Sequence, residues 1–188
     1  MGALHYSVLA SLDGFVADEQ GNFGWAAPDD EVHKYLNSHE RQFGAYLYGR
    51  RMYEVMRYWQ TAPTDESVPF TQRDYANVWR SADKVVFSST LVDVETDRTR
   101  LERTFDAAQV LELKRASARD ISIGGPTIAG EALRAGLVDY VHLFVVPHLI
   151  GAGLRAFSPG QHRELDLLEH ERYAGGTVRL MYGVRNEG

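Results

Sequence analysis

The stretch that decides the fold is Ile121-Ser-Ile-Gly-Gly-Pro-Thr-Ile-Ala-Gly-Glu-Ala-Leu-Arg-Ala-Gly-Leu-Val-Asp139. Ile121 and Ile123 alternate with polar neighbours, as in a β-strand, and the two glycines after them permit a sharp turn. Pro126 suits the first position of a helix, and Gly136 suits the left-handed residue that commonly ends one. The stretch therefore predicts a strand, a tight turn and a helix.

A glycine turn that leads into a helix can hold an anion. The first N–H groups of a helix have no partner within it, and the helix dipole places partial positive charge behind them. Gly124 and Gly125 therefore suit a phosphate. The alternative is that Gly-Gly-Pro only joins a strand to a helix, because a glycine pair alone is a weak signal.

The rest of the chain repeats this pattern. Apolar β-prone runs predict strands at 3–10, 45–49, 83–90, 99–104, 140–147, 165–172 and 177–184. Helices are expected from Pro28, over 52–58, 72–81 and 106–117, and Gly175-Gly176 reads as a hairpin turn. We predict a single α/β domain over 1–188, with a mixed, mostly parallel sheet flanked by helices and a C-terminal antiparallel hairpin.

The helix that opens at Pro28 has acidic residues in its first turn, which favour the helix dipole. Its apolar positions fall at helical spacing, which indicates one buried face: Val32, Tyr35, Leu36, His39 and Phe43. Asp29 or Asp30 is expected to be the N-cap, with catalysis as the alternative role. On this stripe, His39 is expected to be a packing residue rather than a ligand.

Three predicted strands of the parallel part end on glycine or hydroxyl residues. The ends are Gly49-Arg50, Ser88-Ser89 and Gly124-Gly125, and ligands of such sheets bind beyond the carboxyl ends of the strands. Arg50 or Arg51 could reach a phosphate, or could be ordinary surface residues. Ser88 and Ser89 could donate to phosphate oxygens, or could cap a turn.

Composition excludes several kinds of site and partner. The 188 residues include no cysteine, which excludes disulfides and thiolate metal ligands, and we predict no metal site. The net charge is -6 and the basic residues are dispersed, so nucleic acid is not an expected partner. No apolar run is long enough to span a membrane, and we expect a cytoplasmic protein that binds small molecules.

Taken together, these segments resemble the dihydrofolate-reductase-like superfamily, and most closely its branch related to the C-terminal reductase domain of the bifunctional riboflavin-biosynthesis deaminase-reductase. The residues that carry the resemblance are Ser11–Ala17, Gly49–Glu54, Val85–Leu91, Ile123–Gly125, Gly136–Asp139 and Gly151–Phe157. The match covers nearly the whole chain. The companion deaminase would need a cysteine-built zinc site, so this chain cannot be the bifunctional enzyme.

The resemblance implies an NADPH-dependent oxidoreductase that is usually a homodimer. It places the pyrophosphate at Gly124, Gly125, Pro126 and Thr127, further phosphate contacts at Gly49, Arg50 and Arg51, and the adenosine side at Ser88 and Ser89. Contacts of Arg50 and Ser89 to the 2′-phosphate would favour NADPH over NADH.

Hydride would pass to a small pterin- or pyrimidine-like substrate, such as 5-amino-6-(5-phosphoribosylamino)uracil. Asp13, Asp29, Asp30 or an ordered water would supply the proton. The resemblance aligns Asp30 only poorly with the acid of folate reductases. The alternatives are a dihydrofolate reductase and a non-catalytic nucleotide-binding dimer.

The chain departs from the family pattern at three positions. Met52 stands where threonine is common, Tyr140 replaces a glutamate, and His148 replaces an apolar residue. The first departure removes a possible phosphate contact and the second removes a carboxylate. The sequence leaves the roles of these three residues open.

Overall fold

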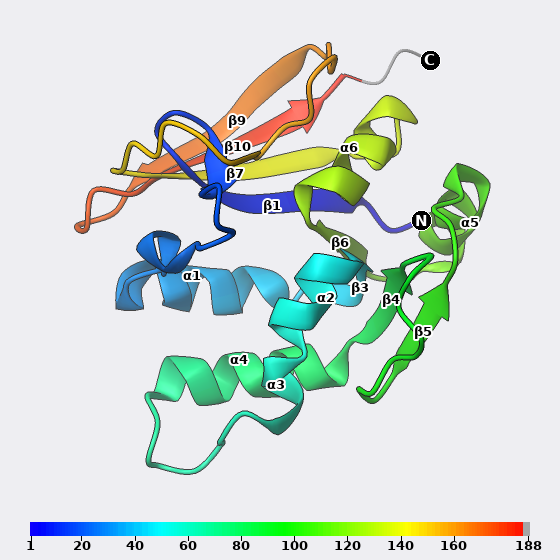
Figure 1. Ribbon diagram of the computed structural model, residues 1–188, viewed down its shortest axis with the longest axis horizontal. Coiled ribbons are helices and arrows are strands. Elements are labelled where there is room, and N and C mark those ends of the chain that lie inside the picture. The colour runs from blue at the N-terminus through cyan, green and yellow to red at the C-terminus, as the bar shows by residue number, and fades with distance from the viewer. Residues whose placement is uncertain (186–188) are drawn as a thin grey trace.

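The computed structural model of the chain describes residues 1–185. Its centre is an eight-stranded sheet in the order β5-β4-β3-β6-β1-β7-β10-β9, shown in Figure 1. The strands are β1 (Leu4–Ser11), β3 (Phe43–Gly49), β4 (Asp83–Phe87), β5 (Thr99–Glu102), β6 (Asp120–Gly124), β7 (Tyr140–Val146), β9 (Leu165–Arg172) and β10 (Val178–Val184). A separate two-stranded sheet pairs β2 (Phe15–Ala17) with β8 (Leu154–Arg155).

The first six strands in this order are parallel, and β10 and β9 add an antiparallel hairpin. Strand β1 is central, because it pairs in parallel with both β6 and β7. The predicted α/β class, the mostly parallel sheet and the C-terminal hairpin are confirmed.

Helices cover both faces of the sheet, and the alternation of side chains along the strands decides which core each residue joins. On β3, Leu47 joins the core under α5 (Ala107–Ala116) and α6 (Pro126–Arg134). Tyr46 and Tyr48 point the other way, toward α2 (Arg50–Met56) and α4 (Phe70–Ser81). Helix α1 (Asp30–Glu40) covers this second face near β7, through Val32 and Phe144.

The opening stretch folds as predicted. Gly125, between β6 and α6, has a φ of 101°, a conformation that favours glycine. Pro126 is the first residue of α6, and Gly136, just past the helix, has a φ of 66°. Gly125, Pro126 and Gly136 therefore each occupy a backbone position that their residue type favours.

Some boundaries differ from the sequence expectation. Helix α1 ends at Glu40, and Phe43 begins β3, so its place on the helical stripe was wrong. The predicted helix over 52–58 begins at Arg50 and ends at Met56, and a short α3 (Tyr58–Thr61) follows. The pairing of β2 with β8 was not predicted, because strands of three and two residues carry no readable alternation. A one-turn 3-10 helix, η1 (Gly24–Ala26), precedes α1.

Within residues 1–185, no helix combines the length and the apolar character needed to cross a bilayer.

Candidate functional site

The three strand ends singled out from the sequence lie side by side. Tyr48 of β3 is in register with Gly124 of β6, and Gly49 is in register with Phe87 of β4. We call the region formed by 49–51, 88–90 and 124–127 the carboxyl edge. The predicted neighbourhood of these segments is thus present, while their contacts to a ligand remain a prediction.

The turn at Gly125 has donors to offer. The N-cap of α6 has no side-chain hydrogen bond, and the backbone bond from the Ala129 N–H to the Gly125 carbonyl measures 3.0 Å. Helices α1 and α5 differ, because the side chains of Asp29 and Asp106 accept hydrogen bonds from their first turns. An uncapped helix start with an exposed Thr127 beside it fits a phosphate group.

Two arginines stand at the next strand end. Arg50 begins α2 and pairs with Glu54 at 3.0 Å, with side chains that are 44% and 38% exposed. An exposed pair of this kind is worth less than about 1 kcal/mol, so the guanidinium can exchange Glu54 for a stronger anion. Arg51 is exposed beside it.

Ser88 and Ser89 follow β4 and have different surroundings. The buried Oγ of Ser88 accepts hydrogen bonds from the N–H groups of Thr90 and Leu91 at 3.2 and 2.9 Å, so it stabilises a turn. Ser89 is exposed. A cavity of about 710 Å³ adjoins this turn and is lined by residues that include Arg50, Tyr53, Thr90, Leu91 and Asp93.

Asp13 lies where β1 ends and holds two loops together. Its carboxylate accepts hydrogen bonds from the Ser11 hydroxyl at 2.6 Å and from the N–H groups of Ile150 and Gly151 at 3.1 and 2.7 Å. These hydrogen bonds, led by that from Ser11, lower the pKa of Asp13 to about 2. The group is therefore a carboxylate at neutral pH.

Asp30 is exposed on the first turn of α1 and pairs with Lys34 at 2.6 Å. The hydrogen bond from Lys34 lowers the pKa of Asp30. Of the two N-cap candidates, Asp29 is the cap, because its carboxylate accepts from the Val32 N–H at 2.9 Å.

The three departures from the family pattern have separate places. Met52 packs against the glycine turn, since a Cβ added to Gly124 would lie 3.2 Å from its Cγ. The Tyr140 ring lies tilted against that of His5, with ring centroids 4.8 Å apart, at the start of β7 and away from the carboxyl edge. His148 is exposed just past the end of β7, and its ring lies 6.1 Å from that of Trp25.

The proximity of the Trp25 and His148 rings could not be predicted from the sequence, because 123 residues separate them. Trp25 also donates to the Asn22 carbonyl at 3.2 Å, so the loop at 18–25 is partly folded on itself.

A mostly parallel sheet with helices on both faces, and glycine or hydroxyl residues at three neighbouring strand ends, defines the class as an α/β protein whose ligands would bind at the carboxyl edge. The family model for the RibD C-terminal domain matches residues 3–179, so the chain belongs to that family. It is accordingly a reductase-like protein of the kind found in riboflavin biosynthesis.

Solved structures agree on the fold. A pyrimidine reductase-like protein from Corynebacterium diphtheriae is 15% identical, with a TM-score of 0.72 over 99% of this chain and 93% of its own. A diaminohydroxyphosphoribosylaminopyrimidine deaminase/5-amino-6-(5-phosphoribosylamino)uracil reductase from Thermotoga maritima is 15% identical, with a TM-score of 0.68 over 98% of this chain. This chain spans 57% of that second protein. No curated protein sequence matches the chain.

Proposed function

We propose that the protein is an NADPH-dependent reductase that transfers hydride to a small pyrimidine- or pterin-like substrate. When bound, NADPH would supply the hydride. The chain would hold the phosphates of NADPH at the carboxyl edge. It would place the substrate beyond β1 and β7, next to the loops joined by Asp13.

The observation that carries this proposal is the uncapped glycine start of α6 beside the arginines of α2. Gly125, Thr127 and the N–H groups of the first helical turn suit a pyrophosphate, because they offer donors without a side chain in the way. Arg50 and Arg51 suit a further phosphate, since guanidinium pairs with phosphate oxygens through two parallel hydrogen bonds.

In this proposal Asp13 is a positioning residue. Its ionised carboxylate keeps the loop at Ile150 and Gly151 against the turn after β1, which fixes one wall of the substrate side. A carboxylate with a pKa of about 2 holds no proton at neutral pH, so an ordered water is the favoured proton source. Asp30 stays a prediction as a donor, although its pairing with Lys34 favours the ionised form.

Cofactor binding is the first test, measured by titrating the protein with NADPH and NADH and following nicotinamide fluorescence. We expect NADPH to bind more tightly. Gly125→Asp should weaken NADPH binding by more than about 100-fold, because it sets a carboxylate against the pyrophosphate.

Gly125→Ala is the matched control, because both variants strain a residue with a φ of 101° and only one adds charge. Equal loss in the two variants would attribute the effect to backbone strain. Lack of binding of either cofactor to the folded wild-type protein would overturn the proposal.

The substrate is tested by cofactor oxidation with 5-amino-6-(5-phosphoribosylamino)uracil and, separately, with dihydrofolate. Oxidation with the first alone supports the proposed reaction. If NADPH bound but was oxidised with neither substrate, the result would favour a non-catalytic nucleotide-binding protein.

We also infer a homodimer, for which β9 is the best surface. This edge strand is exposed at every position, and Leu165, Leu167 and Leu168 are each at least 40% exposed. An exposed apolar edge strand invites pairing with another chain. Sedimentation of the wild type and of Leu167→Glu tests this, and an equal mass for both at the monomer value would contradict it.

A further inference from the structure

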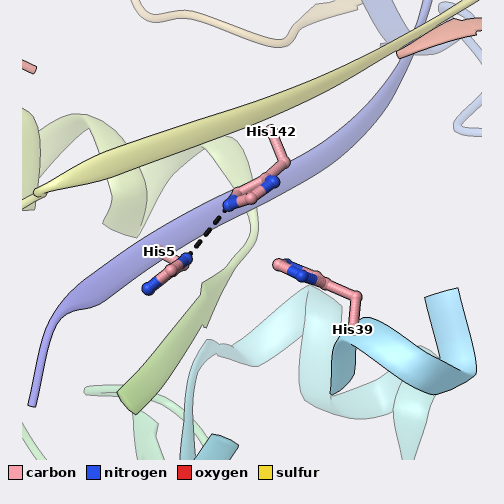
Figure 2. A group of neighbouring side chains, drawn as sticks. All are labelled: His5, His39 and His142. Atoms are coloured by element: carbon pink, nitrogen blue, oxygen red, sulfur yellow. Dashed lines mark hydrogen bonds between the residues drawn. The ribbon is translucent and has the colours of Figure 1, made fainter. Parts of the chain in front are cut away.

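Three histidine side chains meet between the sheet and α1. His5 comes from β1, His142 from β7 and His39 from α1, and Figure 2 shows the His39 ring facing the other two. His5 and His142 are only 3% and 1% exposed, while His39 is half-buried. One ring nitrogen of each lies within 4.8 Å of those of the others. We call these residues the histidine cluster.

Strand alternation and register bring the rings together. Along β1, Leu4 and Tyr6 face the core beneath α5 and α6, so His5 faces α1 instead. On the neighbouring strand, His142 is in register with Ser7 and shares that face. The rings of His39 and His142 are 4.2 Å apart between centroids, and Nδ1 of His5 lies 3.0 Å from Nε2 of His142.

The outer nitrogens of two rings lie next to polar groups outside the cluster. Nε2 of His5 lies 3.4 Å from the Asp120 carboxylate, close enough for charge attraction but without a hydrogen bond among residues 1–185, and Nδ1 faces inward. Nδ1 of His39 is 2.7 Å from the side-chain amide of Gln42, and Nε2 is 3.5 Å from the Ser7 hydroxyl. A carboxylate that accepts from the far nitrogen, as Asp120 can from His5, is the usual second contact of a metal-binding histidine. Gln42 gives His39 the same contact when its amide oxygen, rather than its nitrogen, faces Nδ1, because Nδ1 then carries the proton and Nε2 keeps its lone pair.

His142 adds a separate observation. Among residues 1–185, its Nδ1 atom is buried without a hydrogen-bond partner, and its Nε2 atom contacts only another member of the cluster. No contact outside the cluster therefore commits either nitrogen, and the ring can present one of them to an ion.

The rings are also in the right chemical form. Desolvation lowers the pKa of His39 to about 4 and of His142 to about 2, and it lowers the pKa of His5 as well. Neutral imidazole, with a free lone pair, is the form that binds transition metals. The nearby cation Arg179 is balanced by Glu169 at 2.9 Å and Glu171 at 3.4 Å.

We propose that the histidine cluster is a binding site for a divalent transition metal, zinc above all, with water as the remaining ligand. Three imidazoles suit zinc, which prefers nitrogen ligands at about 2.0–2.1 Å in a tetrahedral arrangement. That geometry needs nitrogens roughly 3.3 Å apart, so the half-buried ring of His39 closes on the other two when the ion binds.

The site is structural rather than catalytic. His5 is the second residue of β1 and His142 the third of β7, so the cluster lies toward the amino ends of these strands, away from the carboxyl edge. An ion there joins α1 to the sheet. This inference does not depend on the proposed reductase activity.

The test uses full-length protein without a histidine tag, stripped with a chelator and titrated with cobalt(II). We expect one cobalt per chain, with the strong visible absorption of four-coordinate cobalt and its displacement by zinc. Free zinc above Kd should multiply the folding equilibrium constant about tenfold for each tenfold rise in concentration.

His39→Gln removes one ligand on the half-buried helix and should weaken zinc binding by at least about 100-fold. His162→Gln, at an exposed position, should bind as the wild type does. No four-coordinate cobalt spectrum with the wild type, or equal zinc binding by wild type and His39→Gln, would overturn the site. Loss in His162→Gln with retention in His39→Gln would also overturn it.

Discussion

The two ends of the sheet differ in how exposed their polar side chains are. At the carboxyl edge, Arg50, Arg51, Ser89 and Thr127 are exposed and need no partner to remain in water. Toward the amino ends of β1 and β7, His5, His142 and Lys114 are buried, where an unpaired polar group costs about 1–3 kcal/mol. The exposed groups are free to bind a ligand, whereas each buried polar atom that stays unpaired lowers the free energy of unfolding.

Removing a buried charge at the amino ends of the strands should lower the free energy of unfolding more than any other substitution proposed below. Lys114 donates to the Asp139 carboxylate and to the Leu137 carbonyl, both at 2.6 Å, and Asp139 also accepts from the Leu4 N–H. Lys114→Met leaves Asp139 without its cation and should lower the free energy of unfolding by about 3 kcal/mol, measured in urea.

The control is Lys34→Met, whose ion pair with Asp30 is 65% exposed on both sides. Its loss should cost less than about 1 kcal/mol. If the two substitutions lowered the free energy of unfolding equally, burial of the Lys114–Asp139 pair would not increase its contribution to stability.

A second contrast lies in the response to pH. Burial raises the pKa of Glu40, at the end of α1, from its ordinary value of 4.5 to about 7. Between these values the unfolded chain loses the proton first, so the contribution of Glu40 to stability falls as pH rises. Relative to wild type, Glu40→Gln should therefore gain roughly 3 kcal/mol between pH 4.5 and pH 8.

Urea unfolding at several pH values gives this difference directly. Glu66→Gln, at an exposed loop position, should show a flat difference from wild type. A flat difference for Glu40→Gln as well would mean that the carboxyl group is solvated in the folded protein.

Binding, rather than stability, should respond at the exposed end. Arg50→Ala should weaken NADPH binding about tenfold, change NADH binding less and leave the free energy of unfolding within about 0.5 kcal/mol. Arg115→Ala, an exposed arginine of α5 paired with Glu112, is the control for charge. If Arg50→Ala weakened the binding of NADPH and of NADH equally, Arg50 would not contact the 2′-phosphate, which only NADPH carries.

Helix caps give the smallest test. Asp29→Ala removes the N-cap of α1 and should lower the free energy of unfolding by about 1 kcal/mol. Asp30→Ala, one residue later, should cost less, because Asp30 accepts no cap hydrogen bond. A reversed order would contradict the assignment of Asp29 as the cap.

The same contrast explains what the sequence could predict. The turn at Gly125 and the end of α6 at Gly136 rest on local backbone chemistry, which sequence displays directly. The assembly of the carboxyl edge then follows from the rule for parallel sheets. The sequence prediction assigned Phe43 to the helix because Phe43 continues the helical spacing of α1. In the structure Phe43 is the first residue of β3.

The histidine cluster had no such signal. His5 and His142 are 137 residues apart, and only strand register and alternation place them together. His39 was predicted as a packing residue, and no local spacing distinguishes a packing histidine from a ligand. The prediction of no metal site considered cysteine and local motifs, and so could not address this group.

The central position of β1 has a consequence for how the chain is made. Its partners in the sheet, β6 and β7, begin at Asp120 and Tyr140, more than a hundred residues later. At roughly 5–20 residues per second, the ribosome leaves this apolar strand unpaired for several seconds or more. During synthesis β1 is therefore a natural target for chaperones, and the late contacts around it are expected to make folding slow.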